Sequence, residues 1–83
     1  MEKIKVYGAD WCGDTQRSRR QLDALGVAYD YIDVEADPQA SGWVKEQNDG
    51  RDRKPTIKIG EQVLSVPSDR ELESALRASG LVS

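Results

Sequence analysis

Alternating apolar and polar side chains predict a short β-strand near the start of the chain. Residues 4–7, Ile-Lys-Val-Tyr, alternate in this way and belong to types that favour strands. From Asp14 onwards, small and apolar residues instead recur at the spacing of a helix. The inward face of this helix is predicted to consist of Thr15, Ser18, Leu22 and Leu25. Gly26 follows, as is typical of the position just past the end of a helix.

A second strand and a second helix are predicted for the middle of the chain. Residues 27–34 are rich in Val, Tyr and Ile, and a strand–helix–strand unit normally closes right-handed with its two strands parallel. Asp37 followed by Pro38 is typical of a helix N-cap and the first helical residue. This helix is predicted to extend to about residue 47, with an inward face of Trp43, Val44 and Gln47. The polar residues 48–54 that follow predict a mobile loop.

The last third of the chain predicts a hairpin and a third helix. Residues 56–59 and 62–66 flank a Gly-Glu pair, which favours a tight turn between antiparallel strands. Ser68 and Glu71 have the spacing of a capping box, so a helix is expected to begin there. Its inward stripe is predicted to consist of Leu72, Ala75, Leu76 and Ser79.

These elements together predict a single α/β domain over residues 1–83. Their order is βαβαββα, which mixes parallel and antiparallel strands in one four-stranded sheet flanked by helices. A chain of 83 residues leaves room for one small domain and no second one.

Charge and residue counts exclude several classes of function. Lys and Arg total 12 against 15 Asp and Glu, and the net charge of −3 argues against nucleic acid or an anionic membrane as partner. One Cys and no His exclude an internal disulfide and a His-based catalytic pair, and they argue against a metal site. No apolar run approaches the ~20 residues of a membrane-spanning helix, and the first residues do not resemble a secretion signal. We expect a monomeric cytoplasmic protein whose thiol stays reduced.

The candidate chemistry lies in the segment Asp-Trp-Cys-Gly-Asp-Thr at residues 10–15. Cys12 is predicted to lie where the first strand enters the first helix, and free backbone N–H groups at a helix start favour a nucleophilic thiolate. Gly13 leaves room for a substrate beside the sulfur. Thr15, one turn further on, is a second candidate catalytic residue because its hydroxyl could donate a hydrogen bond to the sulfur.

Neighbouring charges leave the net effect on the thiol open. Asp10 and Asp14 disfavour a thiolate, whereas Arg51, Arg53 and Lys54 would favour it if their loop folds nearby. The alternative reading of Cys12 is a small buried hydrophobic residue. Its polar neighbours in a strand-to-helix turn favour a reactive thiol instead, with a partly exposed Trp11 as one wall of the site.

The motifs along the chain resemble those of a known family. They are Tyr7 at the end of the first strand, the Trp-Cys-Gly-Asp-Thr loop, Pro55-Thr56 opening the third strand and Pro67-Ser68-Asp69 opening the last helix. Over essentially its whole length the chain is similar to a glutaredoxin-like protein of the thioredoxin fold. The resemblance implies a sheet order of second, first, third and fourth strand, and a cis Lys54–Pro55 bond that brings the Lys54 backbone beside the thiol.

The resemblance also implies the chemistry of the site. Dithiol glutaredoxins have a second cysteine where this chain has Thr15, so a mixed disulfide on Cys12 needs an external thiol for its release, and the mechanism is monothiol. The Trp-Cys-Gly start, with Ala9 where many glutathione-using members have Lys, is more similar to mycoredoxin-like proteins. The expected co-substrate is a low-molecular-weight thiol, glutathione or mycothiol-like, with no tightly bound cofactor.

The family pattern assigns ligand contacts to particular positions of this sequence. The carboxylate of the small thiol is expected near Ser68 and Asp69, at the start of the last helix. Its peptide-like part is expected to pair with the Lys54 backbone before Pro55. The remaining candidate contacts are Trp11, Gly13 and Arg53.

We therefore predict a monothiol glutaredoxin-like thiol–disulfide oxidoreductase that acts on oxidised proteins and small-thiol mixed disulfides through Cys12. A redox-inactive binding module of the same fold is the first alternative. An iron–sulfur carrier that bridges two chains through Cys12 is the second. Asp14 argues against that carrier, because cluster-carrying members have Phe at this position.

Overall fold

The helices and strands follow the predicted order βαβαββα. The computed structural model describes residues 4–82. Its elements are β1 (Ile4–Gly8), α1 (Gly13–Ala24), β2 (Tyr29–Asp33), α2 (Pro38–Gln47), β3 (Thr56–Ile59), β4 (Gln62–Ser65) and α3 (Asp69–Ala78). The predicted α/β class, a thioredoxin fold, is confirmed.

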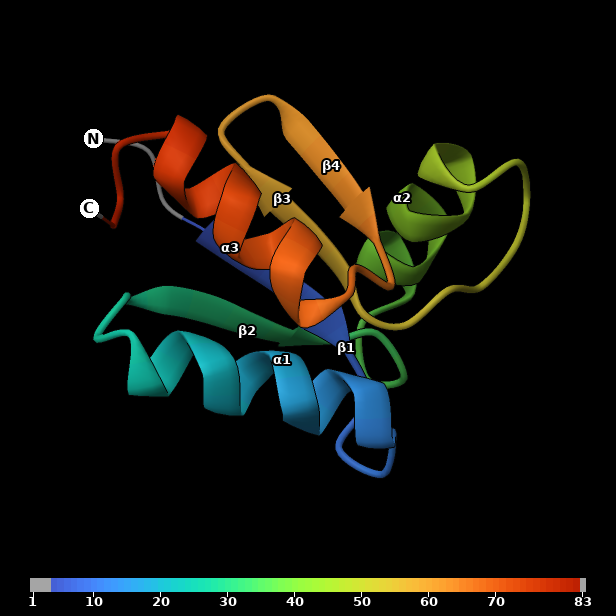
Figure 1. Ribbon diagram of the computed structural model, residues 1–83. Coiled ribbons are helices and arrows are strands. Elements are labelled where there is room, and N and C mark those ends of the chain that lie inside the picture. The colour runs from blue at the N-terminus through green and yellow to red at the C-terminus, as the bar shows by residue number, and fades with distance from the viewer. Residues whose placement is uncertain (1–3, 83) are drawn as a thin grey trace.

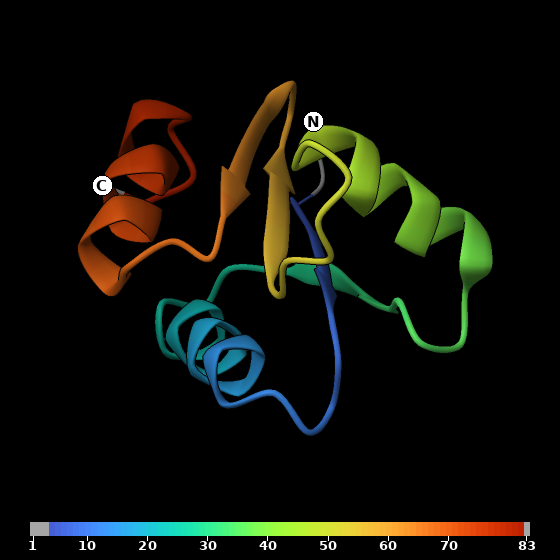
Figure 2. The ribbon, with the colours of Figure 1, turned by 90° about the vertical axis from the view of Figure 1, so that its right-hand side faces the viewer.

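All strands belong to one mixed sheet with the order β2-β1-β3-β4. β1 pairs in parallel with β2 and antiparallel with β3, which forms the hairpin with β4. Helices α1 and α3 lie side by side on one face of this sheet, and α2 covers the other face (Figures 1 and 2). β1 is a central strand, and the loop that leaves its carboxyl end leads into the start of α1.

The two faces of the sheet build two apolar clusters because side chains alternate along each strand. The larger cluster lies under α1 and α3 and consists of Ile4, Val6, Leu22, Ile57, Ile59, Leu72, Ala75 and Leu76. The smaller cluster lies under α2 and consists of Val34, Ala40 and Val44, with Tyr7, Ile32 and Trp43 packed against it. Burying each of the larger side chains contributes about 1.5–3 kcal/mol.

The ends of the predicted helical faces differ from the structure. Leu25 is 38% exposed, since α1 has already ended and the chain turns at Gly26 with a φ of 70°. Ser79 is likewise an exposed C-cap beyond α3. Both residues fit the helical spacing in sequence, but each lies just after the end of its helix, so its side chain is not on the buried helical face.

The end of α2 also departs from the prediction. Gln47 is exposed, whereas Asn48 is buried. The Asn48 amide donates to the Val44 carbonyl at 2.7 Å and to the Thr56 hydroxyl at 3.2 Å, and it accepts from the Ser65 hydroxyl. The polar loop expected to be mobile therefore begins with an anchor that ties α2 to β3 and β4.

Candidate active site around Cys12

Cys12 is the N-cap residue of α1. Its backbone is extended, with φ −79° and ψ 120°, and its carbonyl accepts the first helical hydrogen bond from the Gln16 N–H at 3.0 Å. Its own N–H donates to the Ala9 carbonyl at 3.1 Å, which closes a turn over residues 9–12. The half-buried thiol thus lies at a helix N-terminus, where unpaired backbone N–H groups favour negative charge.

The backbone of Lys54 lies directly beside the sulfur. The Cys12 thiol donates to the Lys54 carbonyl, with 3.6 Å between Sγ and the oxygen. The Lys54–Pro55 bond is cis, as the family resemblance implied, and Pro55 is buried. A carbonyl oxygen can accept from S–H but has nothing to donate to a thiolate, so this contact belongs to the reduced, protonated thiol.

Thr15 does not make the contact predicted from its spacing. It is fully buried, and its hydroxyl accepts from the Ala9 N–H at 3.4 Å. Within residues 4–82 no hydrogen bond joins it to Cys12. A Cβ added at Gly8 would lie 2.5 Å from Thr15 Cγ2, so the side chain of Thr15 is turned against the end of β1. Thr15 thus connects the first turn of α1 to the end of β1, through its hydrogen bond to Ala9 and its packing against Gly8.

Trp11, the residue before Cys12, has an exposed side chain. It is 67% exposed, and its indole Nε1 donates to a carboxylate oxygen of Glu35 at 2.8 Å. The Lys54 ammonium lies 5.6 Å from the ring centroid and 2.6 Å from an oxygen of Asp52. Nothing lies within 4 Å of a Cβ added at Gly13, which leaves open space at the helix start.

Asp10 is held by two side chains that the sequence did not point to. The Tyr31 hydroxyl donates to Asp10 Oδ1 at 2.7 Å, and Gln16 Nε2 donates to the Asp10 carbonyl at 2.6 Å. The Arg19 guanidinium covers the Tyr31 ring at 3.9 Å from the centroid. Desolvation by burial, followed by the hydrogen bond to Asp10, raises the pKa of Tyr31.

The start of α3 carries the predicted capping box. Ser68 Oγ accepts from the Glu71 N–H at 3.1 Å, and the Glu71 carboxylate accepts from the Ser68 N–H at 2.8 Å. Hydrogen bonding to the Ser68 backbone lowers the pKa of Glu71. Because both groups of Ser68 are used within the helix, a ligand carboxylate at this end must either replace that of Glu71 or use another N–H group.

Arg17 connects α1 to the start of α3, a role that the sequence analysis did not identify. Its guanidinium lies 3.3 Å from carboxylate oxygens of both Asp14 and Asp69, and it donates to the Pro67 carbonyl at 3.3 Å. The Asp69 carbonyl also accepts from Gln21 at 2.7 Å. The structure thus brings Ser68 and Asp69 next to α1, through contacts that periodicity could not show.

Arg53 is exposed, and its carbonyl accepts from the Thr56 hydroxyl at 2.9 Å. Its side chain lines a separate polar hollow together with Asn48 and Ser65. Among the described residues of the basic loop, Lys54 is the one joined to Trp11 and Cys12, by a cation–π contact and by a hydrogen bond respectively. Its charge is partly offset by Asp52.

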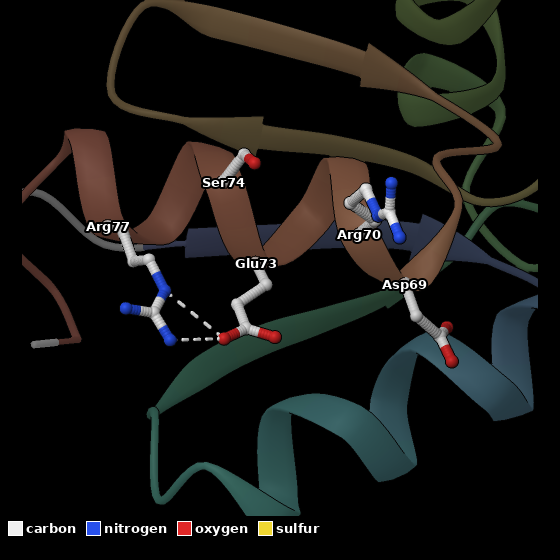
Figure 3. A pocket seen from close by; sticks show the side chains of 5 residues that line it. All are labelled: Asp69, Arg70, Glu73, Ser74 and Arg77. Carbon is white, nitrogen blue, oxygen red and sulfur yellow. Dashed lines mark hydrogen bonds and ion pairs between the residues drawn. The ribbon is translucent and has the colours of Figure 1, made fainter.

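Another hollow follows the outer surface of α3 (Figure 3). It is lined by Asp69, Arg70, Glu73, Ser74 and Arg77, with Glu73 and Arg77 joined by an ion pair. Only Asp69 belongs to the predicted site, and its side chain points toward α1 rather than along α3 (Figure 3). The α3 hollow is therefore separate from the thiol.

Two further findings concern residues 4–82 as a whole. No group of three or more His, Cys, Asp or Glu side chains in this range is arranged to hold a metal ion. None of the helices described there has the length and apolar character needed to cross a membrane.

The sheet order, the cis-proline beside the sulfur and the thiol at a helix N-terminus define a thioredoxin-fold redox protein. Residues 4–64 match the family model described as glutaredoxin. The chain is 38% identical over 61 residues to mycoredoxin 1 of Corynebacterium glutamicum. The aligned region covers 74% of this chain and 75% of that protein. The chain belongs to the glutaredoxin family, and its general role is thiol–disulfide redox chemistry.

Solved structures agree with this assignment. A crystal structure of a thioredoxin-like protein variant superposes with a TM-score of 0.82 at 27% identity, covering 93% of this chain and 97% of the other. The glutaredoxin-like protein NrdH-redoxin from Escherichia coli superposes with a TM-score of 0.78 at 19% identity, covering 87% and 92%. At that identity the second likeness shows the fold alone.

Proposed function

We propose that this protein is a monothiol oxidoreductase that exchanges mixed disulfides between oxidised proteins and a low-molecular-weight thiol. The observation that carries the proposal is the position of Cys12, the one cysteine of the sequence, at the N-cap of α1 with the Lys54 backbone 3.6 Å from its sulfur. A thiol at a helix start is a favourable nucleophile, and an adjacent extended backbone is a natural partner for a peptide-like ligand.

The proposed reaction needs no second cysteine in this chain, because an external small thiol completes it. The Cys12 thiolate attacks the small-thiol sulfur of a protein mixed disulfide, so a new Cys12–small-thiol disulfide forms and the protein leaves as a thiolate that takes up a proton. A second small thiolate then attacks that disulfide. Cys12 is released, and the two small thiols leave as their disulfide. The net exchange consumes one free small thiol: the protein cysteine is released as a thiol, and the small thiol that it carried leaves in a disulfide with the incoming one. Thr15 takes no part in the exchange.

The other candidate residues would bind and orient the small thiol. Lys54 presents its backbone carbonyl to the sulfur next to Pro55. The exposed Trp11 and the open space at Gly13, on either side of Cys12 in sequence, would contact the ligand. Ser68 and Asp69 at the start of α3 would receive a carboxylate. Arg53, one residue before Lys54, would add positive charge to the approach.

The small thiol is proposed to be glutathione or mycothiol-like. The named relative mycoredoxin 1 and the absence of a cation at position 9 both favour the second. Ala9 is fully buried, so that position offers no side chain to a ligand. The proposed setting is the reducing cytoplasm, where the protein would act as a monomer on oxidised protein thiols, and neither nucleic acid nor a membrane is proposed as a partner.

The test measures mixed-disulfide formation at Cys12 by intact mass at neutral pH. Folded protein, urea-denatured protein and the Cys12→Ser variant each meet oxidised glutathione, oxidised mycothiol and cystine. Faster reaction of the folded chain, with preference for one thiol and no adduct on Cys12→Ser, supports the proposal. Equal rates for folded and denatured protein with every thiol refute it.

A redox-inactive binding module is the second candidate. The observation that favours it is the thiol donating to the Lys54 carbonyl, a contact that stabilises the protonated sulfur. An unreactive folded Cys12 that still binds a protein through the Pro55 surface would indicate this function. A visible absorbance band after anaerobic reconstitution with iron, sulfide and a small thiol would indicate a cluster carrier instead.

A further inference from the structure

A side chain of β2 forms a hydrogen bond with the turn that ends at Cys12. Residues 9–12 close through the Cys12 N–H and the Ala9 carbonyl at 3.1 Å, with Asp10 and Trp11 at the tip. The Tyr31 hydroxyl reaches this tip from β2 and donates to Asp10 Oδ1 at 2.7 Å. The partners are 21 residues apart in sequence, so this contact is a product of the fold.

The charged groups on the segments around Cys12 differ in how their charge is compensated. On α1, Asp14 has an ion pair with Arg17 at 3.3 Å. On the loop before β3, Lys54 has one with Asp52 at 2.6 Å. After β2, Glu35 accepts a hydrogen bond from the indole of Trp11.

Asp10 is compensated differently, by a neutral phenol. Within residues 4–82 it has no ion pair, and its carboxylate accepts from Tyr31 instead. Arg19 lies over the Tyr31 ring at 3.9 Å and donates to the Tyr29 hydroxyl at 3.3 Å, so α1 supports the phenol from behind. Asp33, two residues further along β2, also raises the pKa of Tyr31 through its negative charge.

We propose that Tyr31 is a positioning residue for Cys12: its hydroxyl holds the Asp10 carboxylate, disperses that negative charge and so lowers the pH at which Cys12 becomes a nucleophile. A hydrogen bond donated to a carboxylate draws charge from it, and a nearby carboxylate opposes formation of a thiolate. Tyr31 acts through Asp10 and touches no reacting atom. The proposal rests on the thiol itself and does not require the proposed oxidoreductase activity.

The phenol can serve in this way throughout the relevant pH range. Desolvation raises the pKa of Tyr31 first, and the hydrogen bond to Asp10 raises it further. The hydroxyl therefore keeps its proton and can donate to Asp10 over the pH range of the experiment.

The experiment is a pH profile of iodoacetamide alkylation, followed by intact mass because Cys12 is the one cysteine of the sequence. Tyr31→Phe keeps the ring under Arg19 and removes the donor. We expect its reactivity midpoint to rise by ~0.3–0.5 pH unit, which is a loss of about 2- to 3-fold in rate below the midpoint. Asp10→Asn keeps an acceptor for Tyr31 but removes the charge, so its midpoint is expected to fall.

Two further variants separate this role from a purely structural one. In the Asp10→Asn background, Tyr31→Phe is expected to leave the midpoint unchanged, since no charge remains to disperse. Tyr29→Phe is the matched control. It loses a hydroxyl that accepts from Arg19, two positions earlier on β2, and within residues 4–82 no hydrogen bond joins Tyr29 to Asp10. Its midpoint is expected to equal that of the unmodified protein.

Three outcomes would overturn the proposal. They are an unshifted midpoint in folded Tyr31→Phe, an equal shift in the Asp10→Asn background, and an equal shift in Tyr29→Phe. If Tyr31→Phe alkylates at the rate of the denatured chain, this variant is not folded, and the test then rests on Asp10→Asn alone. An unshifted or raised midpoint in Asp10→Asn refutes the charge argument. Failure of the proposed oxidoreductase function would leave all these readings intact, because alkylation needs no thiol substrate.

Discussion

Replacing Gly8 by Ala should destabilise the protein through a collision with Thr15. A Cβ at Gly8 would lie 2.5 Å from Thr15 Cγ2 and 2.6 Å from Thr15 Oγ1. Thr15 is fully buried, so its side chain cannot move aside without disturbing the contact between β1 and α1. Overpacking of this kind typically costs about 1–3 kcal/mol. Gly8 lies in an extended strand, so the cost arises from space rather than from backbone conformation.

The measurement is urea unfolding followed by circular dichroism, with thermal melting as a second readout. For a domain of this size, 1 kcal/mol corresponds to about 4–8 °C in melting temperature. Gly13→Ala is the matched control, since nothing lies within 4 Å of its added Cβ, and we expect a change within about 0.5 kcal/mol. The two glycines lie on either side of the cysteine turn.

A double-mutant cycle tests the cause. Thr15→Ala alone should destabilise, because it leaves the Ala9 N–H without its hydroxyl acceptor. Combined with Gly8→Ala, it removes the two Thr15 atoms closest to the added Cβ and leaves only Thr15 Cβ, at 3.1 Å. The double variant should therefore be more stable than the sum of the single effects predicts, by about 1–2 kcal/mol. A Gly8→Ala protein as stable as the original, or strictly additive effects, would refute the reasoning.

Three other predictions concern the capping box and the buried amide. Ser68→Ala should cost about 1 kcal/mol in urea unfolding, because it removes the acceptor for the Glu71 N–H; an unchanged midpoint would contradict this. The folded state lowers the pKa of Glu71 below 4.5, so its contribution is present above that pH and is lost as the pH falls through the folded value. Acid unfolding of Glu71→Gln should therefore be less steep in that window, and an identical profile would count against it. Asn48→Ala should cost about 1–3 kcal/mol, since it removes the buried amide that donates to the Val44 carbonyl and the Thr56 hydroxyl; Gln47→Ala, at an exposed position one residue earlier, is its near-neutral control.

Local patterns predicted most of the fold because they have local causes. The capping box at Ser68 and the Asp37-Pro38 helix start need only neighbouring residues, and both are present as expected. The alternation in β1 placed Ile4 and Val6 on the buried face. By contrast, the cis bond before Pro55 came from family resemblance, since no local property of the sequence requires it.

The parts of the site that were missed depend on contacts between distant elements. Tyr31 meets Asp10 across 21 residues, and Arg17 meets Pro67 across 50, so neither contact leaves a periodic signal. Asn48 looked like the start of a polar loop, and only the approach of β3 and β4 gives its amide buried partners. Thr15 had the spacing to reach the sulfur, but the absence of a side chain at Gly8 lets it turn toward the sheet instead.

The two tryptophans give the protein two optical probes in contrasting environments. Trp11 is exposed and directly precedes Cys12 in the chain, whereas Trp43 packs against Tyr7 with ring centroids 4.5 Å apart on the α2 side of the sheet. An adduct on Cys12 should therefore quench the emission of Trp11 and leave that of Trp43 unchanged, while unfolding alters both. In a Trp43→Phe variant, a stopped-flow fluorescence trace would follow events at the thiol in real time, without a label and separately from the state of the fold.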